Sequence, residues 1–526
     1  MLKCLYSFFV LFLLSFISYA QTNTKDYNDQ IKKIGLEASK VMDIASNICD
    51  VYGPRLTGSV KLDVAQNWAV NELKSWGMVN VVKEEWGTFG RGWQLDHFEM
   101  HAYSPDYWQV LAYPKAWSPS TSGQVTGEVI YLQANDEAEL AKYKGKLKNK
   151  IVLLDTIREI KEWFDPLAAR YKADELLDMA NAQVPSPRPR RDWARADRMS
   201  FNQILWTFLN DEQPLCIADR SYKGDLGTVF VSGARVGGQE GKRAQDEGVK
   251  IIPQVTIAVE HYNRLLRLVQ KGVISKISFD MKAKYESPNQ GKEHNVLAEI
   301  PGSDLKDEVV MFGAHFDSWH TGTGATDNGA GSAVMMEAAR ILLEYIKQTG
   351  VQPRRTLRLA LWSGEEQGLF GSINYVRKHF AETEPGGWIP KRLLPEQEKI
   401  SAYYNLDNGT GKIRGIYLQG NEEVGPIFRK FLEPFKDLGA NTITLDNTGG
   451  TDHLAFDGVG IPGFQFIQEP MSYFNRTHHS NMDNWDHLVA DDLKQAATIV
   501  ASMVWQTAQR DEKLPRKPLN MDPGTN

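Results

Sequence analysis

From about residue 295 onward, short apolar runs alternate with helical patterns along the chain. The apolar runs of strand length are 309–313, 356–362, 401–406 and 464–467. Between the first two runs, apolar residues recur at i, i+4, i+7, i+8 and i+11, which predicts a helix with one apolar face. Those residues are Val334, Ala338, Ile341, Leu342 and Tyr345. Strands that alternate with such helices predict an α/β fold, in which helices cover both faces of a mixed, mostly parallel central sheet.

The N-terminal part of the chain is expected to join this domain, whereas the C-terminal end is expected to be a tail. Residues 31–76 have helical patterns, and residues 81–112 alternate apolar and polar positions as strands do. We expect residues 21–113 to form the N-terminal part of the domain that continues at 289–510. Residues 511–526 are rich in Lys, Pro and Asp, and we expect them to form a flexible tail.

Residues 114–288 are expected to form an inserted, β-rich domain. A Ser/Thr/Gly-rich stretch opens it, and strand patterns follow at 127–132, 150–155, 228–231 and 251–257. A charged segment with clustered prolines and arginines runs from Glu159 to Arg198 inside this domain. We interpret that segment as a solvated surface excursion, and the alternative is a site for an anion or a partner.

The N-terminus has the pattern of a secretory signal peptide. Lys3 precedes an apolar run from Leu5 to Ile17, and the small residues Ser18 and Ala20 follow. We expect cleavage after Ala20, so that residues 1–20 are removed and the mature protein is secreted or periplasmic. The alternative is an uncleaved N-terminal anchor. No later segment has 18 uninterrupted apolar residues, so we expect no membrane association after cleavage.

Composition narrows the class of protein. The 526 residues include 42% hydrophobic and 24% charged residues, as in ordinary globular proteins. The formal net charge of −6 lacks the positive field that binding to a phosphate backbone requires, which argues against nucleic acid as a partner. After cleavage two cysteines remain, Cys49 and Cys216, and the sequence leaves open whether they form a disulfide or stay buried thiols.

Acidic and histidine residues follow the predicted strands. His315 and Asp317 come after the first strand, Glu365 and Glu366 after the second, and Asp407 after the third. Open α/β sheets bind their ligands outside the carboxyl ends of the strands, so we expect these side chains to converge.

Two loops add further candidates. Asp327 lies in the Gly-rich loop G-T-G-A-T-D-N-G-A-G, which has neither the Lys-Ser/Thr of a P-loop nor the spacing of a dinucleotide fingerprint. The loop T-H-H-S-N-M-D supplies His478, His479 and Asp483. Two histidines and three carboxylates suit two zinc ions when one carboxylate bridges them at a separation of roughly 3.5–4 Å. The glycines beside Asp327 fit a bridging position because no Cβ blocks the approach of the backbone.

At these residues the chain resembles the co-catalytic di-zinc exopeptidase family of peptidase clan MH, in its secreted bacterial aminopeptidase and carboxypeptidase Q-like branches. The matching segments are A-H-F-D-S (314–318), A-T-D-N-G-A-G (325–331), W-S-G-E-E-Q-G-L-F-G-S (362–372), Y-N-L-D (404–407) and T-H-H-S-N-M-D (477–483). The opening D-V-Y-G-P-R-L-T-G-S (50–59) resembles the carboxypeptidase Q-like branch. The resemblance implies the zinc exopeptidase fold, with a protease-associated-like domain at 114–288.

The resemblance also implies a role for each matching residue. His315 and Asp407 would bind one zinc, Glu366 and His479 the other, and Asp327 both. Glu365 would be the general acid and base that hydrolyses a peptide bond with a metal-bridging hydroxide.

Five further residues are candidates for supporting or substrate-binding roles. Asp317 and Asp483 are suited to orient the active-site imidazoles through hydrogen bonds, or else to cap loops. His478 is a candidate donor to the developing oxyanion. Asp452 and His453 lie in T-G-G-T-D-H-L-A-F (448–456), which resembles a family segment near the substrate pocket, although structural capping is the alternative for both.

We therefore expect a secreted, zinc-dependent aminopeptidase or dipeptidase that acts on peptides or dipeptides, and the sequence leaves open whether it forms a homodimer. Three alternatives stay open. They are a glutaminyl cyclase-like acyltransferase with a single zinc, a catalytically inactive binding module, and a two-metal hydrolase of another amide or ester.

Overall fold

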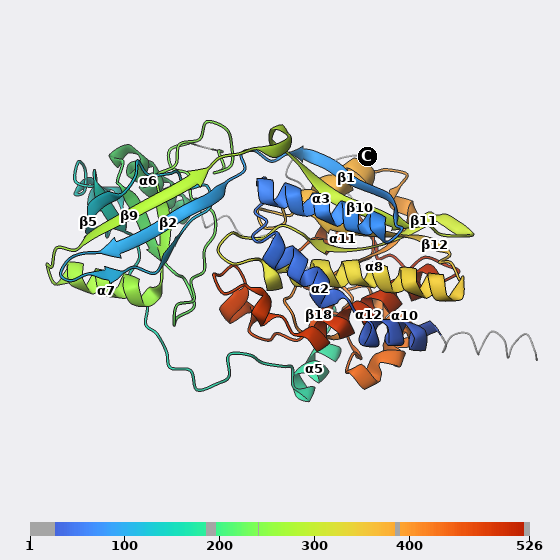
Figure 1. Cartoon of the computed structure of the whole chain (residues 1–526). Coiled ribbons are helices and arrows are strands. Elements are labelled where there is room, and N and C mark those ends of the chain that lie inside the picture. The colour runs from blue at the N-terminus through green and yellow to red at the C-terminus, as the bar shows by residue number, and fades with distance from the viewer. Residues whose placement is uncertain (1–26, 186–195, 240, 384–389, 520–526) are drawn as a thin grey trace, which may run out of the picture.

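The computed structural model describes residues 27–185, 196–239, 241–383 and 390–519, and in this part of the chain two eight-stranded sheets form two lobes (Figure 1). The predicted signal peptide at 1–20 and most of the basic cluster lie outside the described residues. No helix within the described ranges has the length and apolar character needed to cross a membrane.

The larger lobe is built on the predicted α/β sheet. Its strand order is β1-β10-β12-β11-β15-β18-β16-β17. The bounds are β1 (Val79–Thr88), β10 (Lys292–Ile300), β12 (Arg355–Trp362), β11 (Leu305–His315), β15 (Ile400–Asn405), β18 (Gly463–Gln468), β16 (Ile413–Tyr417) and β17 (Thr442–Thr444). β12, β11, β15 and β18 run parallel to one another, whereas β1 and β10 are antiparallel to their neighbours. The fold class predicted from the sequence is confirmed.

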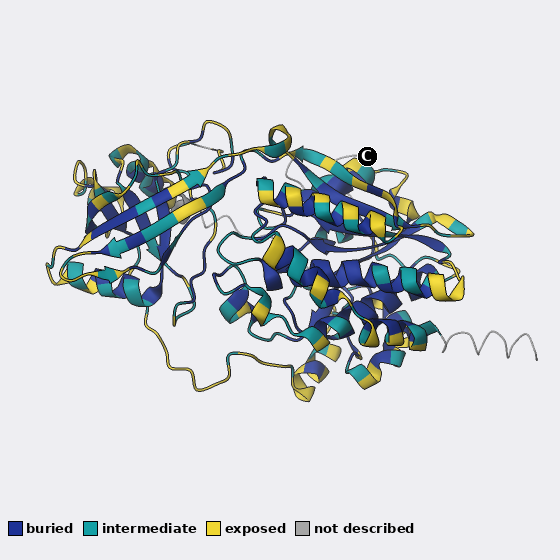
Figure 2. Cartoon of the chain, viewed as in Figure 1, coloured by how far each residue is buried: buried dark blue, intermediate teal, exposed yellow. Residues whose placement is uncertain are grey.

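Helices cover both faces of this sheet because its strands are apolar on both sides. Val310 and Phe312 pack into the core shared with α2 (Val41–Ser46), α3 (Val60–Ser75), α8 (Ala330–Thr349) and α12 (Ala490–Ala508). Val309 and Met311 point to the opposite face and pack with α9 (Phe370–His379) and α11 (His453–Asp457). Successive side chains of a strand alternate between faces, so each central strand contributes to both cores. Figure 2 shows the central strands buried, while α3 exposes its outer positions.

Further helices and strands complete this lobe. They are α10 (Gly425–Leu432), the short pair β13 (Ala381–Thr383) and β14 (Pro390–Leu393), and the helical stretch at 27–37.

The second lobe has its own sheet and core. The strand order is β3-β2-β9-β5-β6-β7-β8-β4. The bounds are β3 (Trp108–Gln109), β2 (Gln94–Ala102), β9 (Lys276–Lys284), β5 (Val125–Tyr131), β6 (Lys150–Leu153), β7 (Cys216–Arg220), β8 (Gln254–Ile257) and β4 (Ala112–Pro114). Its helices are α4 (Glu137–Ala141), α6 (Ala196–Glu212) and α7 (Val259–Gln270). Since β2, β3 and most of β4 precede residue 114, this sheet begins earlier in the chain than the predicted insertion. The assignment to a protease-associated-like domain stays a prediction.

Part of the second lobe's chain leaves it and returns. After β6 the chain crosses to the larger lobe, where α5 (Ala173–Ala180) packs against β17 (Figure 1). On the way, Ala169 pairs with Met471, and Arg170 forms an ion pair with Asp492 at 2.8 Å. The charged segment is therefore partly bound to the larger lobe.

Three details differ from, or extend, the sequence predictions. The strand expected at 228–231 is absent from the second sheet, because Phe230 forms an isolated bridge with Ser480 of the larger lobe instead. Cys49 and Cys216 are both free, buried thiols in separate cores. Burial raises the pKa of Cys49 to about 12, as expected of an inert thiol.

The expectation of a flexible tail is wrong for its first nine residues. Leu514 is 2% exposed and belongs to the core of the larger lobe, and Lys517 pairs with Asp457 at 2.7 Å. The buried side chain of Leu514 and the ion pair of Lys517 hold residues 511–519 in place, although their composition alone predicted a flexible segment.

We predict that Leu514→Ala lowers the free energy of unfolding of the larger lobe by about 2–5 kcal/mol, because it removes a fully packed side chain. Urea unfolding followed by circular dichroism measures the change. Leu226→Ala is the matched control, since Leu226 is 82% exposed. Equal effects of the two substitutions would show that 511–519 do not contribute to the core.

Candidate active site and metal centre

The site forms where parallel strands end. His315 is the last residue of β11, and it is in register with Trp362, the last residue of β12. Glu365 and Glu366 follow β12, and Asp407 follows β15. Because these three strands are parallel neighbours, their carboxyl ends meet at one edge of the sheet.

The five predicted metal ligands converge around Asp327. The Oδ1 atom of Asp327 lies 3.3 Å from Nε2 of His315, and the same His315 atom lies 3.3 Å from Oδ1 of Asp407. The other oxygen, Oδ2 of Asp327, lies 3.2 Å from Nε2 of His479, which is 2.9 Å from Oε2 of Glu366. One carboxylate therefore faces two separate pairs, each made of one imidazole and one carboxylate.

The loop that carries Asp327 is buried and tightly packed. It forms a turn, Ala325–Gly329, directly before α8, and Asp327 (φ −133°, ψ 86°) has non-helical backbone angles. Asp483 holds this turn, because its carboxylate accepts hydrogen bonds from the backbone of Thr326 at 2.6 Å and of Asp327 at 3.1 Å. A Cβ at Gly331 would lie 2.3 Å from the carbonyl oxygen of Leu406, so the close approach of this loop to the end of β15 requires glycine.

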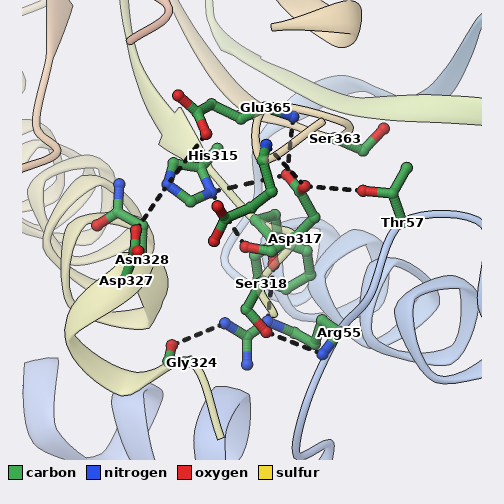
Figure 3. Close-up of polar contacts among 12 residues, drawn as sticks. Arg55, Thr57, His315, Asp317, Ser318, Gly324, Asp327, Asn328, Ser363 and Glu365 are labelled. Carbon is green, nitrogen blue, oxygen red and sulfur yellow. Dashed lines mark hydrogen bonds and ion pairs between the residues drawn. The ribbon is translucent and has the colours of Figure 1, made fainter. Parts of the chain in front are cut away.

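Asp317 connects His315 to both glutamates. Its Oδ1 lies 3.6 Å from Nδ1 of His315, and that nitrogen is 3.0 Å from the Asp317 carbonyl oxygen. Its carboxylate also accepts from the backbone N–H groups of Glu365 and Glu366, both at 3.3 Å. The Thr57 hydroxyl donates to the same carboxylate at 2.7 Å (Figure 3). Asp317 therefore fixes the imidazole and the glutamate turn relative to each other.

Arg55 is a second support that sequence reasoning did not identify. The guanidinium is fully buried and donates to five backbone carbonyls of three separate segments. They belong to Phe316 at 2.7 Å, Thr323, Gly324 and Gly53 at 2.9 Å, and Ile48 at 3.0 Å. Figure 3 shows the contact with Gly324, which joins the end of β11 to the Asp327 loop. The segment D-V-Y-G-P-R-L-T-G-S matched a family signature, but its spacing gave no indication of contacts more than 260 residues away.

The two adjacent histidines differ in environment. Their rings stack with centroids 3.7 Å apart. Nε2 of His478 lies 3.8 Å from Oδ2 of Asp327, and burial lowers its pKa to about 4. Burial also acts on His479, but Glu366 and Asp327 outweigh it and raise its pKa to about 11. The contact with Glu366 favours His479 over His478 as the partner of that carboxylate.

The charges and donor atoms fit a bound cation. Burial and the charge of Asp327 raise the pKa of Glu366 to about 7, and burial raises that of Glu365 above its usual range. Oε1 of Glu366 is buried without a hydrogen-bond partner among the described residues. Carboxylate oxygens and imidazole nitrogens are ligands that zinc binds in proteins, and positive charge at this place would relieve the crowding of carboxylates.

Asp452 and His453 lie beneath the site rather than on its surface. Both are 0% exposed at the start of α11, and burial raises the pKa of Asp452 to about 7 and lowers that of His453 to about 4. His453 Nε2 contacts the Gln419 side chain at 2.6 Å. Whether these residues line a substrate pocket stays a prediction, because the candidate ligand His315 is also 0% exposed.

The sequence profile described as Peptidase family M28 matches residues 295–504, which contain every proposed ligand. Over these residues the chain is similar to the M28 peptidase family. The chain is 31% identical to carboxypeptidase Q of Mus musculus over 276 residues, which are 52% of this chain and 54% of that protein. It is 26% identical to aminopeptidase YwaD of Bacillus subtilis over 231 residues, 43% of this chain and 47% of that protein. The chain thus spans about half the length of the curated relatives it matches.

Solved structures match the chain over most of its length. A peptidase M28 precursor from Shewanella amazonensis covers 94% of this chain and 98% of its own, with a TM-score of 0.66 and 23% identity. BSAP, a zinc aminopeptidase from Bacillus subtilis, covers 90% of this chain and 95% of its own, with a TM-score of 0.55 and 18% identity. At these identities the likeness shows a shared fold.

The second lobe contacts the larger lobe at the candidate metal site itself. The Val231 backbone N–H donates to the carbonyl oxygen of His479 at 3.0 Å. Asn481 donates its backbone N–H to Val229 at 3.1 Å and accepts one from Val229 on Oδ1 at 2.7 Å. Backbone pairing between the lobes therefore holds the loop of His479, whose φ of 60° lies in the left-handed region.

We predict that Thr57→Val lowers metal affinity or catalytic rate by about 10- to 100-fold, the usual effect of losing a hydrogen bond behind a ligand. The substitution keeps the shape of the side chain and removes the donor to Asp317. Competition with a zinc-chelating dye measures the affinity. Thr57→Ser keeps the hydroxyl and should behave as the unmodified protein. Unchanged affinity and rate in Thr57→Val would mean that this bond does not position Asp317.

Proposed function

We propose that the protein is a secreted, zinc-dependent exopeptidase that hydrolyses peptide bonds, acting as an aminopeptidase or a dipeptidase. The observation that carries this proposal is the position of Asp327, whose two oxygens lie 3.3 and 3.2 Å from the imidazoles of His315 and His479. The M28 domain match and the zinc aminopeptidase among the structural neighbours support it.

Two zinc ions are proposed as cofactors. His315 and Asp407 would hold one ion, Glu366 and His479 the other, and Asp327 would contribute one oxygen to each. When bound, such ions supply Lewis acidity for the peptide carbonyl and lower the pKa of water so that hydroxide is available near neutral pH. The supports provided by Asp317, Asp483 and Arg55 keep these side chains in place before the substrate arrives.

Glu365 is proposed as the general base and acid. Its Oε2 lies 4.0 Å from Nε2 of His315, on the edge of the ligand cluster, and its side chain is 9% exposed. Burial raises its pKa, which makes the carboxyl a better proton acceptor than an ordinary glutamate. It would take a proton from the attacking water and return that proton to the leaving amine.

The function is tested by digesting a mixed peptide pool with the full chain, with and without a chelator, and identifying the products by mass spectrometry. We expect trimming from one terminus that stops on chelation and returns when zinc is added. A content near one zinc per chain with cyclisation of N-terminal glutamine would instead favour an acyltransferase. Failure to bind zinc would favour an inactive binding module, and zinc-dependent cleavage of other amides or esters a different hydrolase.

We predict that Glu365→Gln retains zinc but lowers kcat by about 10²-fold or more, because the proton carrier is lost. Elemental analysis and turnover on one peptide measure the two quantities. Asp327→Ala provides the contrast, since it removes an oxygen from both ligand sets and should lose metal. Normal turnover in Glu365→Gln would exclude it from the mechanism, and undiminished zinc in Asp327→Ala would exclude the bridging role.

A further inference from the structure

The backbone of the candidate ligand His479 has a conformation that its neighbours must hold. Its φ of 60° lies in the left-handed region, which costs free energy for a residue with a Cβ and persists only where the surrounding structure determines it. Within the described ranges, the His479 backbone makes one hydrogen bond, which its carbonyl oxygen accepts from Val231 at 3.0 Å. The bond that holds this ligand's backbone therefore comes from the second lobe.

Asn481 fastens the same loop to the second lobe through its side chain. Its Oδ1 atom accepts from the Val229 backbone N–H at 2.7 Å. Its Nδ2 atom donates to the Gly227 carbonyl oxygen at 3.0 Å and to the Tyr113 hydroxyl at 3.2 Å, which uses both N–H donors of the amide. The residue is only 9% exposed. This side chain therefore fixes segment 227–231 of the second lobe against the loop that carries His479.

The imidazole of His479 also packs at the contact between the lobes. Its ring centroid lies 6.0 Å from that of Trp319, with 68° between the ring planes. Trp319 packs in turn against Trp117, with centroids 6.3 Å apart, and Trp117 follows β4 of the second lobe and is 2% exposed. An aromatic stack that reaches the chain after β4 thus bounds the ring on one side, while its Nε2 atom faces Glu366 at 2.9 Å.

The other candidate imidazole is held by contacts inside the larger lobe. His315 is the last residue of β11, and its carbonyl oxygen accepts from the Ser332 hydroxyl at 2.7 Å. Its Nδ1 atom lies 3.0 Å from the carbonyl oxygen of Asp317. Its neighbour in the proposed ligand pair, Asp407, follows β15 of the same sheet. The two halves of the candidate centre therefore differ in what positions them.

We propose that Asn481 is a positioning residue for His479, and that the second lobe thereby completes the half of the metal centre formed by Glu366 and His479. The proposal rests on the two-zinc function above, and it adds that one half of the centre depends on the contact between the lobes. The amide of Asn481 bonds to the second lobe, so this residue acts on the metal through the position of the loop and does not coordinate the metal itself.

The test is a zinc titration of the full chain in competition with a chelating dye, which resolves the two binding steps. We expect Asn481→Ala to weaken one step by about 10- to 100-fold, the usual effect of losing a support behind a ligand, and to leave the other step unchanged. His479→Ala identifies the affected step, because it removes the ligand itself. Asn475→Ala is the matched control and should retain both affinities, since the Asn475 side chain donates to Leu167 at 2.9 Å, outside segment 227–231.

A second variant changes the same contact from the side of the second lobe. Tyr113→Phe keeps the ring and removes the hydroxyl that accepts from Asn481. We expect a smaller loss at the same zinc-binding step, and no further loss when it is combined with Asn481→Ala, because the shared hydrogen bond is then already absent. Thermal unfolding shows whether each variant folds. Additive losses in the double variant, or a loss at the other step, would contradict the proposal.

A third measurement does not depend on zinc. Amide hydrogen exchange in the metal-free chain reports on the N–H groups of Val229 and Val231, which bond to the loop. We expect Asn481→Ala to speed up exchange at both groups and to leave the amides of β11 unchanged. This result would support the positioning of His479 even if the unmodified chain bound no zinc, an outcome that would refute the two-zinc function alone. Unchanged exchange at Val231, unchanged affinity at both zinc steps, or equal weakening of both steps would overturn the proposal.

Discussion

The candidate site gathers several carboxylates at one buried place around Asp327, and the surrounding structure must hold them there. Asp327 is 4% exposed, and its two oxygens face His315 and His479, which arrive from segments more than 160 residues apart. Carboxylates this close repel one another, so the arrangement requires positive charge and rigid supports. The supporting residues each hold a carboxylate or the loop that carries it. Asp483 accepts from the backbone of Thr326, the Thr57 hydroxyl donates to Asp317, and Arg55 donates to five backbone carbonyls.

The parallel sheet supplies the rigidity that the cluster needs. β11, β12 and β15 are buried on both faces, so their ends cannot move apart without disturbing two cores. His315 extends directly from β11, whereas Asp327, Glu366 and His479 lie on short turns pinned by hydrogen bonds. The sheet therefore positions one candidate ligand, and local hydrogen bonds position the others.

The sequence alone predicted the α/β class and the convergence of the candidate ligands, because the ends of parallel strands must meet at one edge. It could not predict the roles of Arg55 and Thr57, since their partners beside the candidate ligands lie more than 250 residues away and nothing local indicates them. Strand propensity at 228–231 was overridden by pairing with Ser480. The polar composition of 511–519 did not indicate that its one buried leucine packs into the core. In the same way, the polar side chains of Asp452 and His453 did not indicate that both are completely buried.

The hydrogen bond from Val231 to His479 couples the orientation of the second lobe to the position of a candidate metal ligand in the larger lobe. A hinge motion that swings the second lobe outward would break this bond and the two between Val229 and Asn481, and it would free the backbone of His479 to leave its left-handed conformation. In the closed arrangement, the second lobe keeps its hydrogen bond to His479. If closure strengthens the binding of a cation through His479, then binding of that cation must stabilise closure by the same free energy. The occupancy of that half of the centre would then report the distance between the lobes.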